Sequence, residues 1–388
     1  MCAETSPFLL LNNSVSSRMQ MRFSPDRFVR MACLSGFLLP LLLLAQLRPG
    51  GWSALGTTFP IHPDYPALVQ PAYAVSLGLS QAVDGSRAWH HLFRQPRLRY
   101  EALWYDPGNP AVLGQALSAA IWLDLELARG SRWTLRYAFG KGPSFMTRPQ
   151  DRRRNPTNIA YAGRLTDLTA LQVYLRRQLA PTLALDLGVT ALHYSSAQVT
   201  VPNLGLNSVG LHLGLQGLPR SPLPLRFVPA RVLRRGLRPA LRLGHGFAAR
   251  IIDDGPVYAV YTLMPYLTWQ PWAKLRLAAG GKAFYHDGLY EFYETQDFGV
   301  GAHRRLATGV VAWVGAEWLL GHLGINLKLG PFLKRPLLMD HRLYTELGLQ
   351  YYWWDTQQRD GWQPFLGLYV HAHSGQADWG ELALGVSF

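Results

Sequence analysis

The chain has 388 residues, of which 48% are hydrophobic and only 16% are charged, whereas soluble domains usually carry about 25% charged residues. The aromatic content excludes a disordered chain. The single long apolar run, residues 33–47, excludes a bundle of membrane-spanning helices. The formal net charge of +14 indicates an anionic partner such as a nucleic acid, an acidic lipid or lipopolysaccharide.

The N-terminal region has the pattern of a secretory signal peptide. A basic segment, Met21–Arg30, precedes an apolar segment, Gly36–Ala45, and small residues predict cleavage after Gly56. Residues 1–56 are therefore expected to be a leader, and export makes nucleic acid the weaker candidate partner. Both cysteines of the chain precede the cleavage point, which excludes thiol catalysis and disulfides in the mature protein.

After the leader, apolar and polar residues alternate with period two, which predicts β-strands. In residues 121–127 the odd-numbered side chains are aliphatic, whereas Asp124 and Glu126 lie on the opposite face. An aliphatic face opposite a face of charged residues and glycine is typical of a transmembrane β-barrel. We therefore predict an all-β fold, a closed antiparallel barrel in a bacterial outer membrane. A soluble sandwich would carry more surface Lys and Glu.

Fifteen segments show this alternation, and they lie near residues 72–80, 97–105, 113–127, 131–146, 164–179, 182–195, 205–216, 240–250, 256–269, 273–286, 305–320, 322–333, 341–353, 362–374 and 377–388. Bacterial barrels normally have an even number of strands. We therefore expect about 14 strands, or 16 if residues 57–71 supply another. The last segment places Phe388 on its apolar face, which is similar to the assembly signal of outer-membrane proteins, so the barrel-assembly machinery is an expected partner.

The chain is expected to divide into two halves. Residues 57–216 form the half with the candidate chemistry. Residues 217–388 form a second half, which we expect to close the same barrel, with two tandem barrels as the alternative. A faint repeat links Phe145–Pro149 to Phe332–Pro336.

One predicted strand pair carries a candidate catalytic group. The lipid-facing register of residues 183–195 continues through His193 and Ser195, and that of the next strand includes Asn207. Antiparallel pairing would gather these side chains at the outer rim, on the lipid side, where polar groups are costly. A His close to a Ser is the base–nucleophile pair of acyl transfer, and a third polar group would orient the imidazole. The alternative is an ordinary polar rim at the level of the lipid headgroups.

His193-Tyr-Ser195, followed by Pro202-Asn203-x-Gly205-x-Asn207, resembles the lipid A 3-O-deacylase family. Residues 105–110 and 155–158 resemble exported acyloxyacyl hydrolases of the same group, and the resemblance covers roughly residues 75–216. It implies an outer-membrane barrel that removes the ester-linked 3-hydroxyacyl chain at position 3 of lipid A. Ser195 would then be the nucleophile and His193 the general base.

The chain departs from this family at the third catalytic position, where characterised members have Glu and this sequence has Asn207. Asn can orient the imidazole but cannot stabilise the imidazolium by charge. Asn203 and a backbone N–H near Ser196 are candidate oxyanion donors. Three arginines of the outward-facing loop 147–160 are candidates for binding lipid A phosphates, although a solvated basic loop is the alternative: Arg152, Arg153 and Arg154.

Two other functions remain open. The His-x-Ser pattern with Asn also resembles outer-membrane phospholipase A, a calcium-dependent enzyme, and a porin or apolar-solute transporter would use the charged lumen as a channel. His371 and His373 are expected to face the lumen, where they could hold a metal or, more ordinarily, join a hydrogen-bond network. For the favoured deacylase we expect no cofactor, no metal and no nucleic-acid partner, with lipid A or lipopolysaccharide as substrate.

Overall fold

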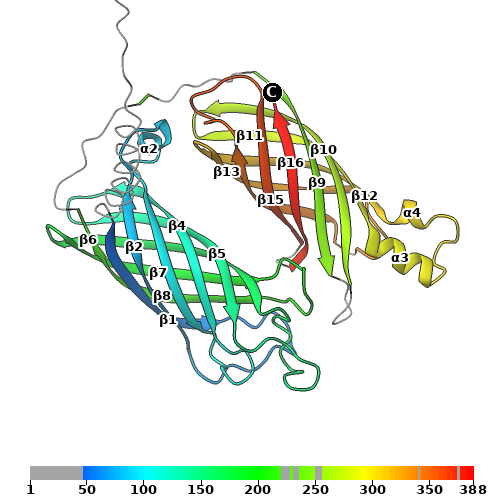
Figure 1. Ribbon diagram of the computed structural model, residues 1–388, viewed down its shortest axis with the longest axis horizontal. Coiled ribbons are helices and arrows are strands. Elements are labelled where there is room, and N and C mark those ends of the chain that lie inside the picture. Colours follow the sequence, from blue (N-terminus) through cyan, green and yellow to red (C-terminus); the bar gives the residue numbers. More distant parts are fainter. Residues whose placement is uncertain (1–46, 220–227, 230–235, 250–255, 340, 374–375) are drawn as a thin grey trace, which may run out of the picture. The chain divides into compact units, whose positions relative to one another are not determined.

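A computed structural model of the chain describes residues 47–219, 228–229, 236–249, 256–339, 341–373 and 376–388. These residues form sixteen strands in two closed antiparallel barrels of eight strands each (Figure 1). Within the described ranges, no helix has both the length and the apolar character needed to cross a membrane.

In the first barrel each strand pairs with its neighbours in sequence, and the first strand closes the ring against the eighth. A short helix, α2 (Ala88–Leu92), joins the second and third strands. The strands are β1 (Arg48–Thr58), β2 (Ala72–Ala82), β3 (Arg97–Asp106), β4 (Ala116–Arg129), β5 (Thr134–Met146), β6 (Leu165–Ala180), β7 (Leu183–Ser195) and β8 (Leu206–Gly217).

The second barrel has the same order of pairing and closes between its own first and last strands. Two helices, α3 (Asp287–Thr295) and α4 (His303–Leu306), lie in the connection between its third and fourth strands. The strands are β9 (Arg238–Ala249), β10 (Val257–Trp272), β11 (Leu275–His286), β12 (Thr308–Leu320), β13 (Leu323–Lys334), β14 (Leu343–Tyr352), β15 (Gln363–His373) and β16 (Gln376–Ser387).

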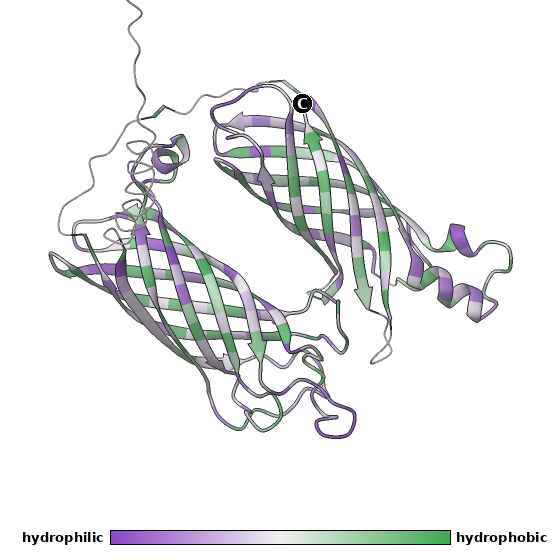
Figure 2. Ribbon diagram, viewed as in Figure 1, coloured by the Kyte–Doolittle hydropathy of each residue, from purple (hydrophilic) through white to green (hydrophobic). Residues whose placement is uncertain are grey.

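The period-two pattern separates a lipid-facing wall from a polar interior. In β7, for example, Leu187 and Val189 are exposed, whereas Asp186 and Thr190 are buried. Figure 2 shows the same alternation of apolar and polar residues along strands of both barrels. Since an aliphatic outer wall requires lipid around it, the transmembrane barrel predicted from the sequence is confirmed.

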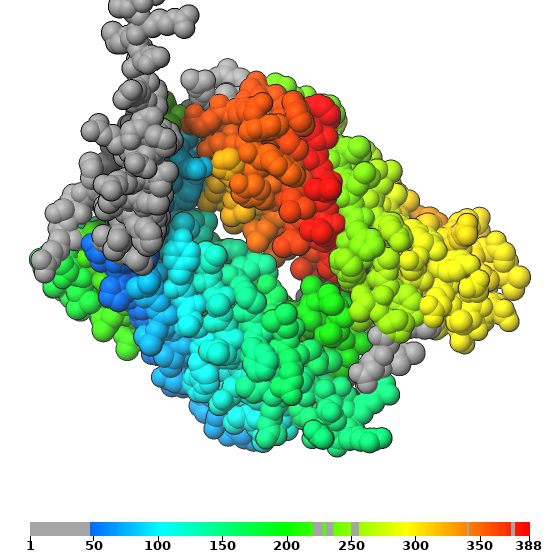
Figure 3. Space-filling model, in the orientation of Figure 1, coloured from blue at the N-terminus to red at the C-terminus, as the bar shows by residue number. Residues whose placement is uncertain are grey.

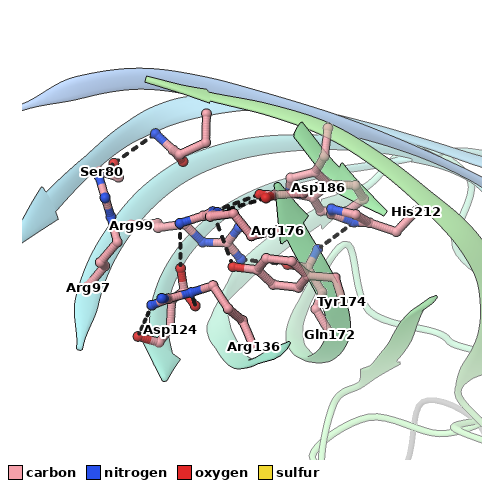
Figure 4. A network of polar contacts seen from close by, with 12 residues as sticks. Ser80, Arg97, Arg99, Asp124, Arg136, Gln172, Tyr174, Arg176, Asp186 and His212 are labelled. Carbon is pink, nitrogen blue, oxygen red and sulfur yellow. Dashed lines mark hydrogen bonds and ion pairs between the residues drawn. The ribbon is translucent and has the colours of Figure 1, made fainter. Parts of the chain in front are cut away.

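Ion pairs fill the interior of each barrel. In the first, Arg136 Nε donates to Asp124 at 2.8 Å and Arg176 donates to both oxygens of Asp186 at 2.7 Å (Figure 4). In the second, Arg242 donates to Glu346 at 2.6 and 2.7 Å. An eight-stranded ring is only wide enough for its own side chains, so this packing argues against the channel considered from the sequence.

The single barrel expected from residues 57–388 is wrong, because β1 pairs with β8 and β9 pairs with β16. The strand total of 16 is the higher of the two numbers considered, but the extra strand is β1 rather than residues 57–71, most of which connect β1 to β2.

Figure 3 shows the side chains over β2–β5 packed as a continuous outer surface.

Cleavage after Gly56 is also inconsistent with the structure. Residues 50–56 pair with both β2 and β8, so removing them would open the first barrel. Residues 1–46 of the predicted leader lie outside the described residues.

The faint repeat falls at equivalent places in the two barrels. Phe145–Pro149 begins at the end of β5 and Phe332–Pro336 begins at the end of β13, and each of these is the fifth strand of its ring. The equivalence allows the two barrels to be compared strand by strand.

Candidate functional site

The candidate site lies where β7 and β8 reach the rim of the first barrel. His193 and Asn207 are direct cross-strand partners. Both share the outward parity of exposed aliphatic residues, Val189 in β7 and Val209 in β8. The residues that follow them in the chain, Tyr194 and Ser208, are buried in the barrel. The period-two pattern therefore presents the imidazole and the amide together on the lipid-facing side.

His193 is held by one strong hydrogen bond. Its Nδ1 lies 2.7 Å from Asn207 Oδ1. Because a carbonyl oxygen only accepts, Nδ1 carries the proton and Nε2 keeps its lone pair. This tautomer is the one that a general base needs.

Two donors converge on the hydroxyl oxygen of Ser195. Asn203 Nδ2 donates to Ser195 Oγ at 3.0 Å, and the backbone N–H of Ala197 donates to it at 3.1 Å. Among the described residues no hydrogen bond joins Ser195 to His193; such bonds often form only when substrate is present. The two donors give the Ser195 oxygen a polarising environment.

Ser196 supports the side chain of Asn203. Its backbone N–H donates to Asn203 Oδ1 at 2.9 Å, so it orients the Asn203 amide rather than facing the reaction. Its hydroxyl donates to the Thr200 carbonyl at 3.1 Å, within the same loop. The backbone N–H that accompanies Asn203 at Ser195 belongs to Ala197, which has a φ of 50°. Strand parity could not reveal this donor, because β7 ends at Ser195.

Gly205 allows the loop after β7 to return close to the imidazole. Its φ is +78°, and a Cβ at this position would lie 3.3 Å from His193 Cε1 and 2.9 Å from the Tyr194 carbonyl oxygen. The Tyr65 hydroxyl donates to the Gly205 carbonyl at 3.1 Å. Burial raises the pKa of Tyr65, so the phenol stays neutral and keeps its proton for this bond.

The loop between β5 and β6 packs against the site loop. The Leu204 and Gly205 N–H groups donate to the carbonyls of Ile159 and Ala160 at 3.4 and 2.8 Å. Asn158 orders the β5–β6 loop by donating to the Arg148 carbonyl at 2.8 Å.

Three exposed arginines of this loop directly follow Asp151, whose side chain caps the turn that they form. Asp151 Oδ1 accepts from the N–H groups of Arg153 and Arg154 at 2.9 and 2.8 Å. These backbone hydrogen bonds lower the pKa of Asp151. Arg152, Arg153 and Arg154 are all open to solvent, on the loop that supports the site.

Three further polar residues lie on the lipid-facing wall beside the site. Asp167 and Thr169 of β6 are the cross-strand partners of Ser195 and His193. Lys141 of β5 forms an ion pair with Asp167 and donates to Thr169 Oγ1 at 3.1 Å. The sequence analysis missed these residues, although Asp167 and Thr169 share the parity of exposed Leu165 and Leu171. The register argument used for His193 could have found them.

The described residues of the second barrel contain no equivalent of the His–Asn pair. His193 and Asn207 form the outermost lipid-facing pair of β7 and β8. The outermost lipid-facing pair of β15 and β16 is Ala372 with Ala377. Alanine has neither a base nor an acceptor, so within the described residues the site chemistry belongs to the first barrel.

Comparisons with known proteins match each barrel separately. Residues 73–216 match the family model described as lipid A 3-O-deacylase, and residues 239–388 match the model described as acyloxyacyl hydrolase, C-terminal domain. No curated protein matches the chain.

Among solved structures, the crystal structure of the outer membrane enzyme PagL is similar over 42% of this chain and 97% of that chain, with 22% identity and a TM-score of 0.30. The NanC porin is similar over 88% of this chain and 98% of that chain, with 9% identity and a TM-score of 0.16. The Pseudomonas aeruginosa protein OccK5 is similar over 88% of this chain and 96% of that chain, with 10% identity and a TM-score of 0.23.

Proposed function

Because this chain belongs to the lipid A 3-O-deacylase family, we propose that it hydrolyses an acyl ester of lipid A with Ser195 as nucleophile and His193 as general base. The chain is an outer-membrane β-barrel enzyme, and its substrate is a lipid of the same membrane. The observation that carries the assignment is the 2.7 Å bond from His193 Nδ1 to Asn207 Oδ1, which leaves Nε2 available as base on the lipid-facing side.

The reaction begins when His193 Nε2 takes the Ser195 proton and Ser195 Oγ bonds to the ester carbonyl carbon. The tetrahedral oxyanion forms beside Ser195 Oγ, where the Asn203 amide and the Ala197 N–H donate. The bond to the sugar oxygen then breaks, and the imidazolium returns its proton to that oxygen. A water molecule, deprotonated by His193, releases the 3-hydroxy fatty acid and restores Ser195.

Within the described residues, the side chain bonded to the imidazole is the neutral amide of Asn207 rather than a carboxylate. The register places Asp167 opposite Ser195, diagonal to His193, a spacing of about 7–8 Å between strands. In our proposal its carboxylate, held by Lys141 and by a 3.2 Å hydrogen bond from Thr169 Oγ1, supplies part of the missing negative charge.

Substrate would reach this site sideways from the membrane. Its acyl chains would lie along the aliphatic wall of β7 and β8, and its phosphates would meet Arg152, Arg153 and Arg154 in charge-assisted hydrogen bonds. Phe388 is exposed, and its N–H donates to the Pro239 carbonyl at 3.0 Å, which extends the pairing of β16 with β9. We assign this aromatic end as the contact for the barrel-assembly machinery.

The decisive experiment is mass spectrometry of lipid A from membranes that contain the wild type, Ser195→Ala or His193→Ala. We expect the wild type to remove one 3-hydroxyacyl chain and both variants to lose this activity. Wild-type activity in a folded Ser195→Ala variant would contradict the assignment of Ser195 as nucleophile. Intact lipid A in the presence of folded wild type would refute the function.

A further inference from the structure

We propose that the second barrel binds a divalent transition-metal ion of the zinc class at its outer end, through His341, His373 and Asp378. His341 lies in the connection from β13 to β14, His373 ends β15, and Asp378 lies near the start of β16. One donor atom from each residue can be chosen so that all three lie within 4.8 Å of one another.

A β-bulge turns Asp378 toward the two histidines. His371 pairs with Trp379 and Ala372 pairs with Ala377, so Asp378 is the extra residue of β16. A bulge of this kind redirects a side chain at the edge of a site. Asp378 Oδ1 lies 2.6 Å from His373 Nδ1, and Asp378 Oδ2 lies 3.7 Å from His341 Nε2. One carboxylate therefore faces both rings.

The two imidazoles lie next to each other. Their rings stack in parallel, with centroids 3.8 Å apart and planes within 3°. Phe332 packs edge-on against His341 at 5.3 Å and limits its rotation. The His341 side chain is 9% exposed, that of Asp378 14% and that of His373 24%. Partial burial makes a bound ion less hydrated while leaving an entrance.

The donor set indicates the kind of ion. Two imidazoles with one carboxylate suit zinc and its neighbours, whereas calcium and magnesium prefer oxygen donors. Zinc bonds of about 2.0–2.2 Å hold tetrahedral ligand atoms roughly 3.4 Å apart, so binding requires the donor atoms to move closer together and the stacked rings to turn their nitrogens toward one point. Three protein donors leave the fourth position for water or another oxygen ligand, as in catalytic zinc sites.

A second group of potential ligands in the same barrel is already neutralised by the cationic side chains around it. Glu346, His371 and Glu381 also lie close together. However, Lys282 Nζ lies 3.0 Å from Glu381 and 3.1 Å from His371, and Arg242 donates to Glu346. These cations already provide the positive charge that an ion would bring. Within the described residues, the ion-pair partners of Asp378 are His341 and His373 rather than Lys or Arg, and a histidine can exchange a proton for a metal.

The test is a titration of the untagged full-length protein in detergent with Co²⁺, which reports coordination by its visible absorption, followed by competition with Zn²⁺. We expect one saturable site per chain. We expect His341→Gln, His373→Gln and Asp378→Asn each to weaken binding at least about tenfold. His62→Gln is the matched control, because His62 faces Asp64 at 3.6 Å in the β1–β2 connection and belongs to no three-ligand group within the described residues; it should leave binding unchanged.

Two results would overturn the proposal: absence of saturable Co²⁺ absorption in the wild type, or wild-type affinity in both folded histidine variants. Heat-modifiable electrophoretic mobility establishes that each variant is a folded barrel. Because His341 lies outside the strands, His341→Gln keeps the test decisive if a change in β15 or β16 prevents folding. The metal site does not depend on Ser195, so the deacylase assignment can stand or fail separately.

Discussion

His193 and Asn207 face each other across β7 and β8, with Nδ1 and Oδ1 2.7 Å apart. A neutral amide therefore occupies the place beside the His193 imidazole where a carboxylate would stabilise positive charge. Hydrogen bonds to charged groups are roughly 1–1.5 kcal/mol stronger than neutral ones.

We expect Asn207→Glu to raise the rate of lipid A deacylation about tenfold, since the new carboxylate would stabilise the imidazolium. Asn207→Ala should lower the rate, because the ring loses its orientation. Initial rates of 3-hydroxy fatty acid release measure both effects. A slower Asn207→Glu enzyme would show that the site is adapted to the amide.

Asp167→Asn should lower kcat roughly threefold to tenfold, because a carboxylate near the imidazolium contributes about 1 kcal/mol at the effective dielectric of a partly exposed site. The loss should be smaller in the Asn207→Glu background, where the charge has been replaced. Lys141→Met is the control that tests whether Asp167 acts only through its ion pair with Lys141. If it lowers kcat as much as Asp167→Asn in both backgrounds, the two residues act only as a structural pair.

Asn203→Ala should reduce kcat about 10²–10³-fold, which is the usual effect of removing one oxyanion donor. The measurement is kcat and KM on lipid A in mixed micelles. Ser196→Ala provides the comparison, since its hydroxyl bonds within its loop to Thr200; it should stay within about threefold of the wild type. A large loss in Ser196→Ala alone would reverse the two roles.

Gly205→Ala should lower kcat/KM about tenfold, because a side chain at φ +78° is strained and its Cβ would crowd His193. Gly361→Ala offers a matched substitution, with a φ of +96° and no atom within 4 Å of the added Cβ. Both variants should fold, as judged by electrophoretic mobility, and only Gly205→Ala should lose activity. Equal activity in the two variants would contradict the contact with His193.

Arg176→Met should destabilise the first barrel by about 3–5 kcal/mol, because it leaves the buried Asp186 carboxylate without its partner. Arg177→Met removes the same side chain from the next position, which is exposed, and should change stability by less than about 1 kcal/mol. Urea unfolding in lipid vesicles measures the difference. Similar midpoints for the two variants would show that the interior network is not a source of stability.

The sequence was informative where the two-residue period holds. It sets which face each residue of β7 occupies, and antiparallel pairing then brings Asn207 to His193. The period does not extend into the loop that follows. There, turn geometry directs the Ala197 N–H to Ser195 Oγ and the Ser196 N–H to Asn203 Oδ1.

The alternation of apolar and polar residues could not predict which strands pair to close each barrel. β1 contains Gly50, Gly51 and Ser53, has little aliphatic alternation and follows directly on the leader pattern, so it was not recognised as a strand. Without β1 the first eight strands could not be counted, and the end of the first ring at Gly217 could not be seen. Alternation describes faces of strands, whereas closure depends on which distant edges pair.

Two separate closures have a consequence for the membrane around this protein. Sixteen strands in one ring would enclose a wide aqueous lumen, whereas two rings of eight enclose only their own side chains. Each ring therefore meets lipid with its own aliphatic wall, and polar and charged side chains fill its own interior. An enzyme that draws its substrate from the surrounding leaflet uses the outer wall of a ring and does not need its lumen.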